Sequence, residues 1–261
     1  MTETPKPSSS LSEILGLKPG DMATVMGAGG KATLMKRIVI ELVDSGTPVL
    51  VTGTTNLQSL EDWSGPSLLL SDAEREKADE AAREWAARGA VVWVEKKLPR
   101  DMFRGIPVEQ VESLHRQSEG NVLIVKTDGA RKRCIKTPRE GEPVIPKGAT
   151  HCIVVLGLNA VGEKAGPDIV FRFELACRIG GFEEGQTIEA RHLAALASHP
   201  ESYPGRLPAG VKRVLYLSYC VSPDRLALAR EIWNSVPAGT FDLLVAGDTV
   251  EGKFYLCGDK K

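Results

Sequence analysis

A glycine-rich segment, Gly27-Ala28-Gly29-Gly30-Lys31-Ala32-Thr33, constrains the fold of this chain most. It follows an apolar run at residues 22–26 and opens a helical pattern that continues to about residue 44. Backbone amides of such a loop converge at a helix N-terminus, where the helix dipole adds positive potential, so they bind an anion such as a phosphate. Lys31 would add a full positive charge at the β- or γ-phosphate. The segment therefore predicts a strand, a phosphate-binding loop and a helix in succession.

Two nucleotide-binding motifs compete for this loop. A P-loop requires a glycine five residues before Gly30, where the chain has Val25, and a hydroxyl after the lysine to bind Mg²⁺, where it has Ala32. The spacing Gly27-x-Gly29-x-x-Ala32 also satisfies the dinucleotide motif, but the strand predicted at 48–53 is followed by Thr54-Thr55-Asn56 rather than by an acid. We favour mononucleotide phosphates, with Gly27 to Thr33 as the cradle. A dinucleotide site and a turn that binds nothing stay open as alternatives.

The pattern along the chain predicts an α/β fold: a three-layer arrangement with a mostly parallel sheet and helices on both faces, similar to P-loop NTPases. Residues 1–10, rich in proline and serine, are expected to form a flexible leader, and residues 11–261 a single domain. Residues 167–208 suggest a small helical insertion without strands. Strands are predicted at 22–26, 48–53, 90–95, 122–127, 152–157, 211–218 and 241–247, and helices at 31–44, 71–88, 107–117 and 223–233.

Composition limits the classes of partner and compartment. The formal net charge of -1 gives the molecule as a whole no attraction to nucleic acid. No apolar run approaches the roughly 20 residues of a membrane span, so we expect no membrane partner. The five cysteines form no C-x-x-C pair, and this odd number is typical of reduced thiols. We therefore expect a cytoplasmic protein, of an oligomeric state that the sequence does not indicate.

A second group of candidate site residues follows the predicted strand at 122–127. Asp128 stands at the tip of this strand, where a P-loop protein holds Mg²⁺, and Thr54 at the tip of another strand carries a hydroxyl that could join it. Both residues could equally form turns. Arg131 and Lys136 in the basic run that follows could neutralise phosphates, or belong to a solvated loop. Lys31 and Asp128 are the candidate catalytic residues.

Taken together, these segments resemble the selenium cofactor biosynthesis proteins of the YqeC type, described as accessory proteins of selenium-dependent molybdenum hydroxylases. The resemblance extends from about Leu11 to Gly247. It implies a P-loop protein that binds ATP or GTP in the maturation of a molybdenum and selenium cofactor, with a maturation protein of such an enzyme as its partner. Mg²⁺ could bind as well, but Ala32 weakens its site. The segments that carry it are residues 17–21, the loop at 27–31, Thr54-Thr55, residues 128–131, Lys136-x-Pro138, residues 142–146 and residues 197–201.

The chain departs from that family in three places that concern chemistry. The family loop usually continues Gly-Lys-Thr-Thr, whereas this chain has Ala32 after the lysine. Lys126 replaces a glutamate of the family's Glu-Ala-Asp-Gly, and residues 218–221 replace an Asn-Lys-x-Asp element that recognises a base. All three changes indicate weak or absent hydrolysis. Three functions stay open: a slow nucleotide hydrolase or phosphoryl-transfer enzyme, a catalytically silent protein that binds or senses a phosphorylated small molecule or cofactor, and a dinucleotide-dependent oxidoreductase.

Overall fold

A computed structural model describes residues 7–58, 67–70, 89–117 and 120–259. Its main sheet has nine strands in the order β13-β12-β11-β9-β1-β7-β2-β4-β3. Neighbouring strands run parallel, except that β13 pairs antiparallel with β12. The bounds are β1 (Met22–Gly27), β2 (Val49–Gly53), β3 (Ser67–Leu70), β4 (Ala90–Val94), β7 (Val122–Lys126), β9 (His151–Gly157), β11 (Lys212–Ser218), β12 (Leu243–Asp248) and β13 (Lys253–Asp259).

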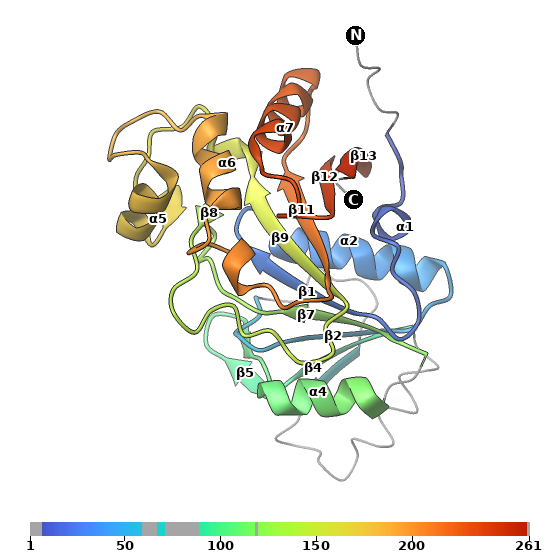
Figure 1. Cartoon of the computed structure of the whole chain (residues 1–261). Helices are drawn as coiled ribbons and strands as arrows, with labels where there is room; N and C mark the ends of the chain where they lie inside the picture. The colour runs from blue at the N-terminus through green and yellow to red at the C-terminus, as the bar shows by residue number, and fades with distance from the viewer. Residues whose placement is uncertain (1–6, 59–66, 71–88, 118–119, 260–261) are drawn as a thin grey trace.

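Helices cover both faces of this sheet, because its central strands are apolar on both sides and must be buried on both. On one face, α1 (Leu11–Leu15) and α2 (Lys31–Asp44) pack on alternate residues of the strands, such as Val25 and Val155. On the other face, among the described residues, lie α4 (Val108–Gln117), α6 (Ala190–Ser198) and α7 (Pro223–Ser235), and α5 (Phe173–Gly180) packs against α6 (Figure 1). The predicted three-layer α/β fold is therefore confirmed.

The predicted elements agree with the observed ones where the sequence pattern is strong. All seven predicted strands are present, and α2 has the predicted bounds. The predicted helix at 71–88 lies outside the described residues. The expectation that 167–208 contains no strand is wrong, since β10 (Val170–Phe171) pairs with β8 (Ile135–Lys136) beside α5 and α6. A small hairpin, β5 (Lys96–Leu98) with β6 (Met102–Arg104), was also not predicted.

The end of the expected leader contacts the domain. Ser8 and Phe254 exchange two backbone hydrogen bonds, of 2.7 and 3.0 Å, at the edge of the sheet. The hydroxyl of Ser10 caps α1 by accepting a hydrogen bond from the amide of Glu13. Residues 7–10 of the predicted flexible segment are thus held by the domain.

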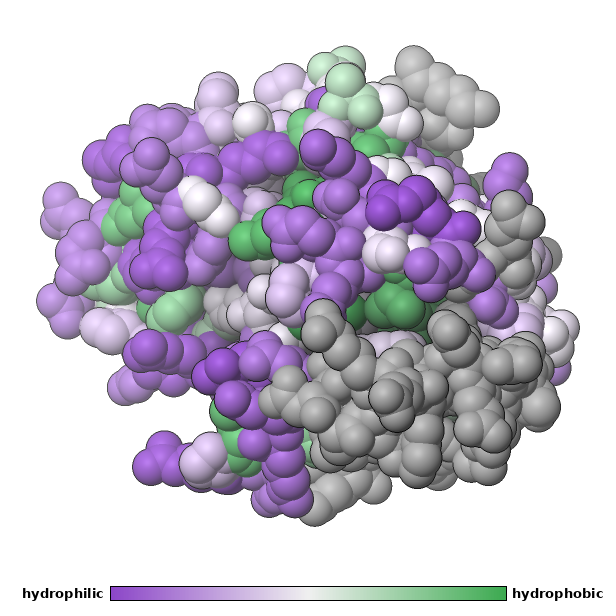
Figure 2. Space-filling model, turned by 90° about the horizontal axis from the view of Figure 1, so that it is seen from below, coloured by the Kyte–Doolittle hydropathy of each residue, from purple (hydrophilic) through white to green (hydrophobic). Residues whose placement is uncertain are grey.

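On the face seen in Figure 2, the described residues are mostly hydrophilic, with apolar residues in small separate groups among the polar ones. Scattered apolar residues of this kind are normal on a protein surface. In the part of the chain that the structure describes, no helix combines the length and the apolar character needed to cross a bilayer.

Candidate anion-binding site

The glycine loop joins the end of β1 to the first turn of α2, and only glycine fits two of its positions. Gly27 and Gly29 have φ angles of 97° and 82°, in the left-handed region that other residues rarely adopt. A Cβ atom at Gly27 would lie 2.1 Å from the carbonyl oxygen of Val155, and one at Gly29 would lie 2.6 Å from that of Cys134. The close approach of neighbouring backbone therefore fixes the path of the loop.

Some backbone amides of the loop donate hydrogen bonds within the protein, and others have no partner in the helix. The amides of Gly27, Ala28 and Gly29 donate to Asp128 Oδ2, Val155 O and Arg133 O, at 3.1, 2.9 and 3.1 Å. The hydroxyl of Ser218, at the end of β11, donates to the carbonyl oxygen of Gly29. The first hydrogen bond of α2 joins the amide of Leu34 to Gly30 O, so the amides of residues 30–33 have no acceptor within the helix. These four amides are available to an anion.

A cleft of about 510 Å³ opens at this helix N-terminus. Residues 29–33 of the loop form part of its lining, and its other walls come from the ends of β2 and β7 and the segment after β7. Among the lining residues that the structure describes, none is an aspartate or glutamate. Five are cationic: Lys31, Lys126, Arg131, Lys132 and Arg133. The cleft therefore has the charge of a site for a strongly negative ligand.

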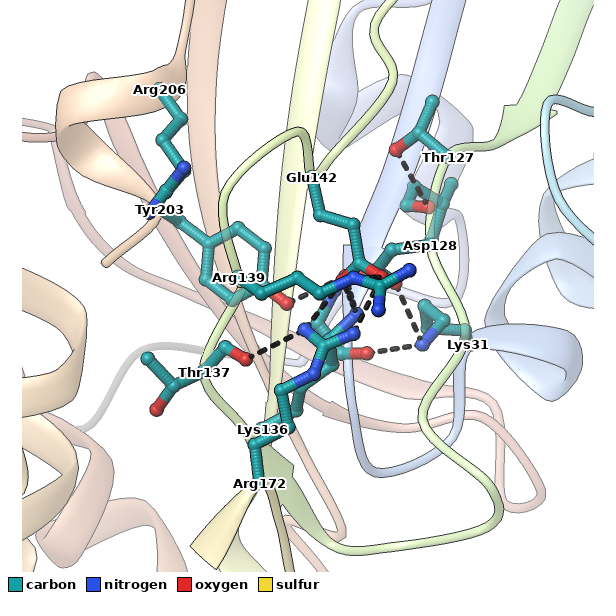
Figure 3. Close-up of polar contacts among 12 residues, drawn as sticks. Lys31, Thr127, Asp128, Lys136, Thr137, Arg139, Glu142, Arg172, Tyr203 and Arg206 are labelled. Atoms are coloured by element: carbon teal, nitrogen blue, oxygen red, sulfur yellow. Dashed lines mark hydrogen bonds and ion pairs between the residues drawn. The ribbon is translucent and has the colours of Figure 1, made fainter. Parts of the chain in front are cut away.

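Beneath the cleft, Lys31 is held by a buried carboxylate. Its ammonium lies 3.0 Å from Oδ1 of Asp128 and donates to the carbonyl oxygen of Gly27. Asp128 follows β7, which pairs directly with β1, and the strand order thus places the carboxylate below the loop. Oδ2 of Asp128 accepts from Lys136 at 2.9 Å and from the hydroxyl of Tyr203 at 2.6 Å (Figure 3).

The cluster continues to a second carboxylate, Glu142. Lys136 also donates to Glu142, at 2.6 Å, and Arg172 makes two hydrogen bonds to the same carboxylate, at 2.6 and 2.7 Å (Figure 3). The exposed Arg139 reaches it at 3.5 Å. Without Arg139, three buried or mostly buried cations surround two carboxylates, which leaves the cluster with one excess positive charge.

Burial and neighbouring charges shift several pKa values in the site. Burial lowers the pKa of Lys31, although Asp128 opposes this shift. Burial alone would raise the pKa of Asp128, but Lys31 and Lys136 outweigh it and the pKa is lowered, so Asp128 is ionised. Burial and the charge of Asp128 raise the pKa of Tyr203, which therefore stays a hydrogen-bond donor. Burial, with the charge of Lys31 next, lowers the pKa of Lys126 to about 8.

The structure places some of the predicted site residues at the cleft, whereas Gly27, Ala28, Lys136 and Thr54 are not among the residues that line it. Gly29 to Thr33 and Arg131 line the cleft, and Asp128 touches Lys31 below it. Lys136 is fully buried behind Asp128, away from the position we expected at the phosphates. The hydroxyl of Thr54 donates to Val144 O at 2.9 Å, and Thr54 lies with Asp128 at a second cleft of about 610 Å³.

These residues do not fit the predicted Mg²⁺ site. Ala32 offers no side-chain oxygen, and Asp128 is already engaged by two ammonium groups, a hydroxyl and an amide. Within the described ranges, no group of three or more histidines, cysteines or carboxylates could hold a metal ion. Mg²⁺ usually keeps one or two carboxylate ligands in nucleotide sites, and the described residues that line the cleft include none.

Strand order argues against the dinucleotide alternative. In a dinucleotide-binding sheet the second strand lies next to the first, so that an acid at its tip reaches the ribose. Here β7 lies between β1 and β2, and residues 54–56 after β2 carry no acid. In this arrangement no acidic residue among 54–56 stands where it could bind the ribose of a dinucleotide.

Comparison with known proteins identifies the family. A family profile described as YqeC protein matches residues 23–174, which is more than half of the chain. The chain belongs to the YqeC family. It is 27% identical over 251 residues to "Uncharacterized protein YqeC" of Escherichia coli (strain K12), with 94% of each chain covered.

Among solved structures, the chain is similar to chloroplast FtsY from Physcomitrella patens, with a TM-score of 0.44 and 14% identity, over 96% of this chain and 66% of that one. It is also similar to the signal recognition particle receptor FtsY from Elizabethkingia anophelis, with a TM-score of 0.38 and 14% identity, over 91% of this chain and 61% of that one. The chain therefore spans less than two thirds of either solved chain.

Proposed function

We propose that this YqeC family protein binds a nucleoside triphosphate, ATP or GTP, through its phosphates, and hydrolyses it weakly or not at all. One observation carries the proposal: the cleft at the N-terminus of α2 combines five cationic side chains with a lining free of carboxylates among the described residues. Free amides at a helix N-terminus and a lysine in its first turn are the groups that bind phosphate in nucleotide-binding loops.

Weak hydrolysis follows from the state of Asp128. Phosphoryl transfer needs a group that positions or deprotonates the attacking oxygen, and usually a metal ion that holds the phosphates. Asp128 is ionised and its oxygens already contact Lys31, Lys136 and Tyr203, so it has little capacity to accept a further proton. Ala32 removes the hydroxyl that would hold the metal. Both features favour a protein that binds or senses a ligand over a slow hydrolase.

The biological role that we propose is the one that the family resemblance implies: an accessory factor in the maturation of selenium-dependent molybdenum hydroxylases, acting with a maturation protein. The test is the activity and selenium content of such a hydroxylase purified from cells that lack this protein. Cells that carry the Lys31→Met variant should resemble the deletion. Wild-type activity and selenium content in the deletion strain would refute this role.

Calorimetry tests the binding proposal directly. ATP, GTP, pyrophosphate and NADH are titrated into the wild type, each with Mg²⁺ and again with EDTA. We expect ATP, GTP and pyrophosphate to bind in at least one of the two conditions. NADH should bind no more tightly than pyrophosphate, because the site has no position that recognises a dinucleotide. Lys31→Met should abolish binding, whereas Lys253→Met, which changes an exposed lysine on the edge strand β13, should not. Equal binding by wild type and Lys31→Met would refute the assigned site.

A further inference from the structure

We propose that the cleft binds its polyphosphate ligand without a metal ion. The ammonium group of Lys126 then neutralises phosphate charge, as a divalent cation does in other nucleotide sites. This inference rests on the proposed function and specifies the form of the ligand. It starts from the misfit between the site and Mg²⁺: the chain keeps a phosphate cradle but places no carboxylate in the lining that the structure describes.

Oxygen ligands for a metal are poorly placed in this cleft. Thr33 and Thr55 supply hydroxyls to its lining, but Thr33 is one residue beyond the position of the usual ligand, and one helical step rotates a side chain by about 100°. The nearest carboxylate below the loop, Asp128, is fully buried. Turning it toward a metal would leave Lys136 and Lys31 buried without that partner, which is costly.

Lys126 stands where it can replace the metal. It is the last residue of β7 and pairs in register with Val25 of β1 on one side and Gly53 of β2 on the other, at the edge of the sheet where the glycine loop begins. Its ammonium donates to the carbonyl oxygen of Asn56, another residue that lines the cleft. A hydrogen bond to a neutral carbonyl can be exchanged for a stronger one to a phosphate oxygen.

Charge repulsion completes the argument. Lys126 and Lys31 are close enough that the charge of Lys31 lowers the pKa of Lys126. A divalent cation bound between them would add two positive charges to a place that already holds two. A polyphosphate that arrives alone instead attracts both ammonium groups, and Arg131, which also lines the cleft, adds a third cationic group.

The test compares metal-free and metal-bound ligands by calorimetry. Inorganic triphosphate and ATP are titrated into the wild-type protein in EDTA and in excess Mg²⁺. We expect binding in EDTA to be at least as tight as in Mg²⁺, because Mg²⁺ neutralises the charge that the cleft recognises. Lys126→Met should weaken binding in EDTA about tenfold or more, the order expected when one charge-assisted hydrogen bond is lost, and Lys253→Met should leave it unchanged.

A reversed variant provides an independent measurement. Lys126→Glu combined with Ala32→Thr supplies a carboxylate and a hydroxyl at the cleft, and should make triphosphate binding depend on Mg²⁺. Binding by the wild type only in Mg²⁺ would overturn the inference and leave the proposed function intact. Wild-type affinity of Lys126→Met in EDTA would overturn the role of Lys126. An absence of phosphate binding in every condition would instead refute the proposed function itself.

Discussion

The two partners of the buried pair Lys31 and Asp128 should contribute very differently to folding. Their side chains are 6% and 0% exposed, and they belong to a cluster in which Lys31, Lys136 and Arg172 surround Asp128 and Glu142. Asp128→Asn keeps the shape but leaves three cations with one carboxylate. Lys31→Met keeps most of the volume and leaves two cations with two carboxylates.

The magnitudes follow from this balance. Removing one partner of a buried ion pair costs about 3–5 kcal/mol when the other charge is left without compensation, and this applies to Asp128→Asn. Such a loss is between about a fifth and the whole of the roughly 5–15 kcal/mol that stabilises a typical domain. After Lys31→Met, Oδ2 of Asp128 retains Lys136, the hydroxyl of Tyr203 and the amide of Gly27, but Oδ1 loses its ion pair. We expect that variant to lower the free energy of unfolding by about 1–3 kcal/mol, less than Asp128→Asn, because one buried oxygen is left without a partner while the charge of Asp128 stays compensated by Lys136.

Urea denaturation followed by tryptophan fluorescence measures both effects, since the chain has four tryptophans. The double variant should recover part of the loss caused by Asp128→Asn, because the lysine left without its carboxylate is then absent, and the double-mutant cycle gives the coupling energy. A destabilisation by Lys31→Met as large as that by Asp128→Asn would refute the reasoning from charge balance. Such a result would mean that Lys31 is needed for the fold and not mainly for a ligand.

Two further predictions concern the backbone of the loop and the response to pH. Gly29→Ala should lower the free energy of unfolding by clearly more than Gly46→Ala does. Both changes place a side chain at positive φ, which costs about 1–2 kcal/mol, but only at Gly29 would the new Cβ atom also clash with neighbouring backbone atoms. Equal losses in urea denaturation would contradict this. Burial lowers the pKa of His192, whose Nδ1 accepts from the amide of Glu189, so stability should fall as pH drops below the unfolded value of about 6.5. His192→Asn should reduce that loss between pH 7.5 and 5.5; an unchanged pH dependence would contradict it.

The sequence predicted the central strands well because each is a buried apolar run bounded by turn residues. In β9 and β7 nearly every residue is buried, and such runs give a clear signal without any knowledge of neighbours. The strands that sequence reasoning missed are two to seven residues long and lie at the edges of the main sheet, as β13 does, or in two-stranded sheets, as β10 does. Their formation depends on a partner strand, which local sequence does not show.

Part of the candidate site could be predicted because it lies at the ends of strands that the sequence shows clearly. The glycine loop and Asp128 each follow such a strand, and in a parallel sheet the ends of neighbouring strands lie at the same edge, so the two were expected to be close together. Tyr203 and Arg172 reach the cluster from segments 75 and 30 residues away from their partners, and nothing in their local sequence indicates a site. Glu142 had a weak signal, since it stands in one of the segments that resemble the family.

The hydrogen bond from Ser218 to the carbonyl oxygen of Gly29 determines how the loop meets a ligand. In a trans peptide the carbonyl and the next amide point in opposite directions, so anchoring this carbonyl to β11 turns the amide of Gly30 the other way. The loop is then preorganised before any ligand arrives, and the entropy of ordering it is lost during folding and not during association. The segment that takes the place of a base-recognition element in this chain thus supports the phosphate cradle instead.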